Sequence, residues 1–193
     1  ENLAWKLAAV IEGQAGARLI ESYERERMQA ADENIGHSTR STDFIAPHSA
    51  AERCLRNAVL NLAPKAEFAR RMINSGRLSV ATVYDTPLST LDEASFVGSA
   101  RLSAPVPDVP VRVHDGKSGH LLEQIGGDFT LLYAKDGAPP NVPDGIRLMT
   151  VGEDVIDTTG AFAQRFDAKP GTTYLLRPDQ HVCARWRALD TAS

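Results

Sequence analysis

Two cysteines, Cys54 and Cys183, are the side chains most able to do redox or nucleophilic chemistry in this chain of 193 residues. A dithiol oxidoreductase needs Cys-x-x-Cys at the N-terminus of a helix, where the helix dipole lowers the thiol pKa. The two cysteines lie far apart in the sequence, so we predict no dithiol chemistry and no disulfide framework. We expect each to be a small buried apolar residue, and this usage favours a reducing compartment, the cytoplasm.

Histidines and carboxylates are the next candidates. The five histidines show no metal-binding spacing such as His-Glu-x-x-His. His114, Asp115 and His120 could meet, but a solvated loop is the simpler interpretation. The acidic cluster at residues 153–157 is better explained as charge at the start of a helix than as a catalytic carboxylate pair. We therefore expect no catalytic residue and no metal ligand.

Gly116-Lys117-Ser118 resembles the end of a phosphate-binding loop. Val111 stands where that loop needs its first glycine, so a surface turn is the better interpretation. The chain also contains no Gly-x-Gly-x-x-Gly, the glycine pattern that binds a dinucleotide. We therefore expect no cofactor-binding residue in this chain.

Composition limits the partners. The net charge of −4 gives no electrostatic case for nucleic acid, and no apolar run approaches the roughly 18 to 20 residues of a membrane span. The charge is near zero through Val83 and about −5 beyond it, which suggests two units.

Residues 1–76 show the periodicity of helices. One apolar face of the first helix is formed by Leu3, Leu7, Val10 and Ile11. Gly13 ends this helix, and a second helix begins near Leu19 and is expected to run into the thirties. Pro47 ends whatever element precedes it.

Ser49 and Glu52 form the capping-box pattern that starts a third helix. Its expected apolar stripe consists of Leu55, Ala58, Val59 and Leu62. A fourth helix carries Phe68 and Met72 and stops at Asn74-Ser75-Gly76.

Beyond this point the pattern changes to strands. Residues 77–84 are predicted as extended, and 85–110, with four prolines, as a linker lying over a surface. Further strands are predicted at 111–113, 129–133, 146–151, 172–176 and 181–186, the last two as a hairpin. His120 begins one or two helical turns, and Asp157 or Thr158 caps a helix that carries Phe162 and Phe166.

Two separate segments resemble one protein family. Asn2-Leu3-Ala4-Trp5-Lys6-Leu7 and Ser22-Tyr23-Glu24-Arg25-Glu26-Arg27 resemble the helices that close the FAD-binding region of flavin-dependent aromatic hydroxylases. Residues 169–186 (Lys-Pro-Gly-Thr-Thr-Tyr-Leu-Leu-Arg-Pro-Asp-Gln-His-Val-Cys-Ala-Arg-Trp) resemble the final hairpin of the C-terminal domain of the same family. Between them, Asn74-Ser75-Gly76-Arg77-Leu78-Ser79 resembles the crossover into that domain.

The resemblance favours the branch that includes phenol hydroxylase and 3-(3-hydroxyphenyl)propionate hydroxylase. It implies that the chain starts inside a helix of a larger parent, whose flavin-contacting residues precede Glu1. Tyr23 and Arg27 would then hold their helix against that missing domain. Met28 replaces a proline usual in the family, so the helix is expected to continue.

The resemblance also implies a fold of mixed α+β or α/β class. Residues 1–83 form a helical tail of the FAD and substrate region, 84–110 a linker, and 111–193 a thioredoxin-like domain that lacks Cys-x-x-Cys. Residues 136–145 are too few for the usual helical crossover between parallel strands, so a loop is expected there.

The parent would hydroxylate phenolic rings with FAD, NAD(P)H and O2. The chain itself would be structural and inactive alone, with the missing FAD-binding domain as its partner and a homo-oligomer as the expected assembly. The alternative is an independent thioredoxin-like redox or interaction domain.

Overall fold

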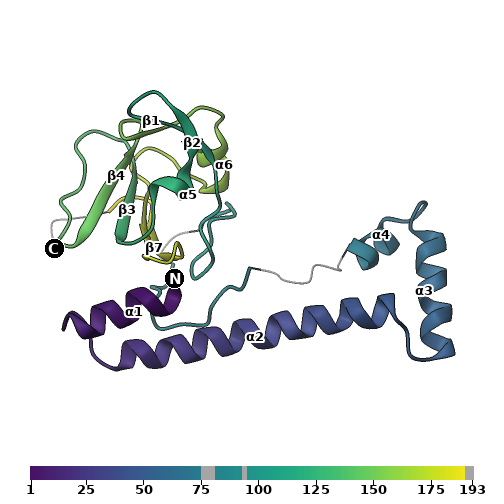
Figure 1. Cartoon of the computed structure of the whole chain (residues 1–193). Helices are drawn as coiled ribbons and strands as arrows, with labels where there is room; N and C mark the ends of the chain where they lie inside the picture. Colours follow the sequence, from purple (N-terminus) through teal and green to yellow (C-terminus); the bar gives the residue numbers. More distant parts are fainter. Residues whose placement is uncertain (75–80, 93–94, 190–193) are drawn as a thin grey trace. The chain divides into compact units, whose positions relative to one another are not determined.

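The structure, a computed structural model, describes residues 1–74, 81–92 and 95–189. The chain forms two compact units (Figure 1). Residues 1–26 and 83–193 make up the first, here called the sheet unit. Residues 27–82 make up the second, here called the helical unit.

Two helices supply the first segment of the sheet unit. The helix α1 (Asn2–Ile11) is followed by Gly13, whose φ of 73° is a left-handed conformation that suits glycine. The helix α2 (Arg18–Ile45) contributes its first turns, through Glu26, and continues into the helical unit. Both helices are present, and α2 continues through Met28, as expected from the absence of proline there. It ends at Ile45, beyond the thirties where its end was predicted.

The helical unit contains the rest of α2 together with α3 (Ala50–Leu62) and α4 (Glu67–Asn74). The predicted capping box is confirmed, because the Glu52 backbone N–H donates to Ser49 Oγ at 3.1 Å and the Glu52 carboxylate accepts from the Ser49 backbone N–H at 2.9 Å. The predicted end of α4 at Ser75-Gly76 lies outside the described residues.

The predicted apolar stripe of α3 is exposed for most of its length. Val59 is buried, but Leu55 and Leu62 are 58% and 45% exposed, and Cys54 is exposed as well. The main neighbour of α3 is α4, a helix of eight residues that is too short to cover the whole stripe.

A mixed sheet of seven strands forms the body of the sheet unit, in the order β2-β1-β5-β4-β3-β6-β7. Its strands are β1 (Pro110–Val113), β2 (Ser118–His120), β3 (Phe129–Ala134), β4 (Ile146–Val151), β5 (Val155–Asp157), β6 (Thr173–Leu176) and β7 (Val182–Trp186).

The centre of the sheet follows the prediction. The strands β3 and β4 are parallel, with Leu131 opposite Leu148, and residues 135–145 join them as a loop without a helix. The strands β6 and β7 form the predicted antiparallel hairpin, and β6 also pairs antiparallel with β3.

Short elements depart from the prediction. The strands β2 and β5 were not expected; each has only three residues, which is too few to show a period of two. The helix α6 (Ala161–Arg165) has Gly160 at its N-cap, not Asp157 or Thr158. Asp157 ends β5, but its carboxylate accepts hydrogen bonds from the backbone N–H groups of Thr159 and Ala163. The expected turn at His120 is α5 (Leu121–Gln124).

The core of this unit lies between the sheet and the short helices α5 and α6 (Figure 1). Phe162 of α6 and Phe166, which follows that helix, stack at 4.5 Å, and Tyr174 of β6 meets Phe166 edge-on. Burial raises the pKa of Tyr174 to about 12, and its hydroxyl donates to the Phe166 carbonyl.

Residues 83–109, in their described part, form neither helix nor strand, and parts of this segment bond to the outer edge of β7. The N–H of Ser103 donates to the Val182 carbonyl at 2.9 Å, and the N–H of Thr90 donates to the Cys183 carbonyl at 3.0 Å. Of the predicted extended segment 77–84, residues 77–80 lie outside the described residues.

Candidate functional site: a buried ion network

The motifs singled out by spacing lie on the surface. Gly116 and Lys117 form the turn between β1 and β2, closed by a hydrogen bond from the Gly116 N–H to the Val113 carbonyl. His114 and His120 are exposed, and His120 Nδ1 lies 2.7 Å from Asp108 Oδ2. Among the described residues no group of three or more His, Cys, Asp or Glu side chains could hold a metal.

The acidic side chains at residues 153–157 each make a different contact. Glu153 pairs with Lys135, and Asp154 accepts the Thr150 backbone N–H at 2.7 Å within the turn after β4. Only Asp157 lies near a helix start, so the expectation that the whole cluster is helix N-terminal charge is wrong.

The two cysteines are free and belong to different units. Cys183 is half-buried on β7, where its Sγ donates to the Leu88 carbonyl at 3.0 Å. Burial raises the pKa of the Cys183 thiol, which disfavours the nucleophilic thiolate.

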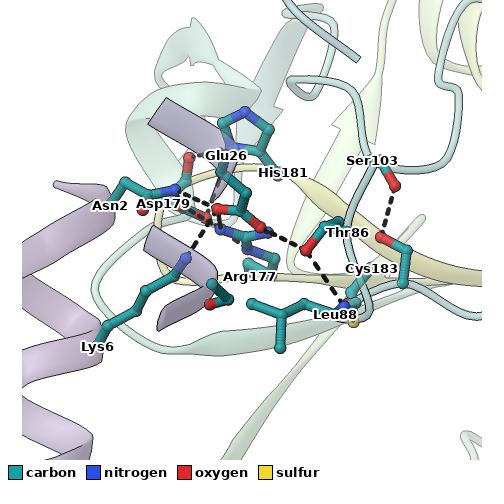
Figure 2. A network of polar contacts seen from close by, with 12 residues as sticks. Asn2, Lys6, Glu26, Thr86, Leu88, Ser103, Arg177, Asp179, His181 and Cys183 are labelled. Carbon is teal, nitrogen blue, oxygen red and sulfur yellow. Dashed lines mark hydrogen bonds and ion pairs between the residues drawn. The ribbon is translucent and has the colours of Figure 1, made fainter. Parts of the chain in front are cut away.

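The feature that stands out is a cluster of four charged side chains inside the sheet unit (Figure 2). Lys6 and Glu26 are fully buried, and the side chains of Arg177 and Asp179 are 1% and 2% exposed. They come from α1, from α2 and from the turn between β6 and β7. These four residues are called the buried ion network below.

Arg177 is the centre of this network. Its Nη1 and Nη2 donate to the two carboxylate oxygens of Glu26 at 2.8 and 3.0 Å. Its Nε and Nη2 donate to the two oxygens of Asp179 at 3.0 and 2.7 Å. A planar guanidinium can serve two carboxylates in this way, whereas an ammonium group cannot.

Three further donors complete the coordination of the carboxylates. Lys6 Nζ lies 2.8 Å from Glu26 Oε2, and Thr86 Oγ1 donates to Glu26 Oε1 at 2.7 Å. The Asn2 amide donates to both carboxylates, at 2.8 Å to Glu26 and 2.7 Å to Asp179. His181 lies beside Asp179, with Nδ1 at 2.9 Å from its backbone carbonyl.

These contacts explain the pKa shifts. Burial alone would raise the pKa of Glu26, but hydrogen bonds from Arg177, Lys6, Asn2 and Thr86 outweigh it and lower the pKa to about 2. The pKa of Asp179 is also lowered, because the donors on His181 and Arg177 outweigh its burial. Burial lowers the pKa of Lys6 and is only partly offset by Glu26.

Trp5 packs against the network from α1. Its ring lies 5.4 Å from the Arg177 guanidinium carbon and 5.7 Å from Lys6 Nζ, and it meets Phe129 of β3 edge-on at 5.6 Å. Trp5 Nε1 and Asn2 Oδ1 are buried and have no hydrogen-bond partner among the described residues.

A shallow groove of about 520 Å3 borders Trp5. It lies within the sheet unit, and its lining includes Glu1, Trp5, Ile125, Gly126, Pro178 and Gln180. Glu1 is the acidic residue of this lining, and no Lys or Arg belongs to it, so the groove offers no cationic Lys or Arg side chain to a phosphate.

The network holds segments together and is not built for proton transfer. Two cations face two anions, so the four charges balance, and each carboxylate is satisfied by several donors. A general base needs a pKa near the working pH, whereas the pKa of Glu26 is about 2.

The spacing of catalytic residue types in the sequence does not indicate this network. The available signal was indirect: Lys6, Glu26 and Arg177 each lie in one of the runs that carry the family resemblance. Sequence alone did not show that these runs meet in space.

Comparison with known proteins finds relatives named as monooxygenases and hydroxylases. A family model described as an FAD binding domain matches residues 1–38. The 2,4-dichlorophenol 6-monooxygenase of Delftia acidovorans is 26% identical over 97% of this chain and 39% of the enzyme. A 3-(3-hydroxy-phenyl)propionate/3-hydroxycinnamic acid hydroxylase of Klebsiella pneumoniae is 29% identical over 68% of this chain and 23% of that protein.

A solved structure has a similar fold. The crystal structure of the flavin-dependent monooxygenase PieE, in complex with FAD and substrate, superposes with a TM-score of 0.67 at 20% identity. The match covers 97% of this chain and 40% of PieE, so the chain spans about two fifths of the length of PieE and of the Delftia enzyme. The resemblance predicted from the sequence is confirmed. None of the described helices is long and apolar enough to cross a membrane.

Proposed function

We propose that this chain, which matches the C-terminal portion of FAD-dependent aromatic hydroxylases, belongs to an enzyme that adds one oxygen atom of O2 to a phenolic ring. That enzyme would use FAD and NAD(P)H, and the flavin would supply the oxygen chemistry. The observation that carries the proposal is the buried ion network. It joins Lys6 and Glu26, inside the region matched by the FAD-binding model, to Arg177 and Asp179 of the sheet unit.

The chain's own role in this proposal is structural. The sequence carries no Gly-x-Gly-x-x-Gly pattern, and the lining of the groove beside α1 contains the acidic Glu1 and no Lys or Arg. The amide of Asn2, at the start of α1, donates into the network and is not available to a ligand. FAD would therefore be held by the rest of the enzyme, with Tyr23 and Arg27 as proposed contacts to it.

The finer architecture belongs to the same proposal. Residues 1–83 would be the helical tail of the FAD and substrate region, 84–110 a linker, and 111–193 a thioredoxin-like domain without Cys-x-x-Cys. The parallel pair β3 and β4 beside the antiparallel hairpin β6 and β7 supports that last assignment. A homo-oligomer and a cytoplasmic location complete the proposal, the latter favoured by two free cysteines.

The test uses the protein encoded by the complete gene, purified beside the 193-residue chain. We expect the complete protein to carry FAD and to oxidise NAD(P)H with formation of a catechol when a simple phenol is added. The chain alone should leave FAD fluorescence unchanged in a titration. A complete protein without flavin, or stoichiometric FAD binding by the chain alone, would contradict the proposal.

A further inference from the structure

We propose that Arg177 is a positioning residue that fixes α1 on the sheet unit, and that the sheet unit thereby helps to retain FAD in the whole enzyme without touching it. The first half of this statement concerns the chain alone. The second half rests on the proposed function.

The contacts of Arg177 support this positioning role. It comes from the turn between β6 and β7, yet two of its nitrogens bind Glu26 of α2, at a sequence separation of 151 residues. Glu26 in turn binds Lys6 of α1 at 2.8 Å. The guanidinium also lies over the ring of Trp5, so Arg177 contacts both helices through charge or aromatic packing.

Because the network is buried, loss of Arg177 should strongly destabilise the contact between the two helices and the sheet. Charges removed from water are stable only while they remain paired, and removal of one partner leaves an uncompensated charge in the interior. Without Arg177, the carboxylates of Glu26 and Asp179 would face Lys6 as the one remaining cation of the network. The simplest relief is for α1 and the start of α2 to separate from the sheet, so that water reaches the carboxylates.

The remainder of the sheet unit does not depend on this contact. Its core consists of residues on β1, β3 to β7, α5 and α6, together with the segment before β1. No residue of α1 or α2 belongs to that described core cluster. Loss of Arg177 should therefore loosen the two helices before it opens the sheet.

The link to FAD follows from where the family model matches. Residues 1–38 match an FAD binding domain, and Asn2, Lys6 and Glu26 lie inside that range. In the proposed enzyme, α1 would be continuous with the domain that holds the flavin. An α1 that is free to move would weaken the domain's hold on the cofactor.

The first experiment uses the 193-residue chain and peptide-resolved hydrogen exchange. In Arg177→Met, exchange in residues 2–11 should become faster by about 100-fold or more, as expected for a broken buried ion pair, while residues 129–134 stay protected. Arg177→Lys keeps the charge but not the two-carboxylate geometry, so it should give an intermediate rate.

The matched control is Arg25→Met. Arg25 is one residue from Glu26, but it is exposed and pairs with exposed Asp85 at 3.0 Å. Its loss should leave exchange in α1 unchanged. If Arg177→Met opens residues 129–134 as well, Lys6→Met provides the same test from the α1 side. Unchanged exchange in α1 in that variant, or in Arg177→Met, overturns the proposal.

The second experiment measures FAD retention in the protein encoded by the complete gene. Arg177→Met should weaken FAD binding at least tenfold, with partial recovery in Arg177→Lys and no change in Arg25→Met. Equal FAD affinity in all variants overturns the coupling to the flavin. A complete protein that holds no FAD refutes the proposed function instead, and the exchange result then decides the role of Arg177 in the chain by itself.

Discussion

Replacement of Glu26 by glutamine should remove a defined part of the acid sensitivity of the sheet unit. The pKa of Glu26 is about 2 in the folded chain, against an ordinary value of 4.5. A group whose folded pKa is depressed contributes stability above its unfolded pKa and loses it as the pH falls through the folded pKa. The pH window is therefore about 5 to 2.

The magnitude follows from the shift. At 1.36 kcal/mol per pKa unit, a difference of about 2.5 units corresponds to about 3 kcal/mol of unfolding free energy. The wild-type sheet unit should lose this amount from Glu26 as the pH falls from about 5 to 2, and Asp179, whose pKa is also lowered, adds to the loss. Glu26→Gln should lack the first contribution and keep the second.

The assay is urea unfolding at a series of pH values. Both tryptophans, Trp5 and Trp186, lie in the sheet unit, so their fluorescence follows that unit. At neutral pH Glu26→Gln should be less stable by about 3 to 5 kcal/mol, because Arg177 and Lys6 keep their charges while one partner is lost. Its stability should then vary less with pH than that of the wild type.

A matched variant, Glu24→Gln, changes an exposed carboxylate on the same helix and should give the wild-type pH profile. If the profiles of wild type and Glu26→Gln run parallel between pH 5 and 2, the buried ion network does not control the pKa of Glu26. The reasoning from hydrogen-bond donors would then be refuted.

Three further outcomes follow from local geometry. Ser49→Ala should lower the stability of α3 by about 1 kcal/mol, seen as faster amide exchange in residues 50–54; Ser49→Asp should keep the wild-type rate, and equal rates in all three would argue against the cap. Gly98→Ala should lower the melting temperature of the sheet unit, because its Cβ would lie 2.3 Å from the Arg165 carbonyl oxygen, whereas Gly16→Ala meets nothing within 4 Å; equal melting temperatures would be evidence against that packing. The chain should not accelerate insulin reduction by dithiothreitol, and activity lost on Cys183→Ser would contradict the assignment of that thiol as inert.

Elements with strong local signals could be predicted from the sequence. Ser49 and Glu52 satisfy each other's backbone within four residues, so the start of α3 needs no tertiary information. The central strands are long enough to show their apolar character, and β3, β4, β6 and β7 lie close to where they were predicted.

Elements and contacts that depend on the tertiary structure could not be predicted from the sequence. The strand β5 has three residues and is held by its pairing with β1, where Val155 lies opposite Val113. The exposure of Leu55 depends on which element packs against α3, and the sequence of α3 does not identify that element. Arg177 and Glu26 each look like ordinary surface charges in sequence, because their pairing depends on a contact across 151 positions.

The segment before β1 has a consequence for assembly. The strand β7 is the last in the sheet order, and an edge strand with free backbone groups can recruit a strand from another chain. Here Val182 exchanges backbone hydrogen bonds with residues 103 and 104, and the Gln180 carbonyl accepts from Val106. Pro105, which cannot donate a backbone hydrogen bond, lies opposite His181. The first residues of β7 are thereby covered, so this part of the edge is not available for strand addition by a second copy of the proposed enzyme.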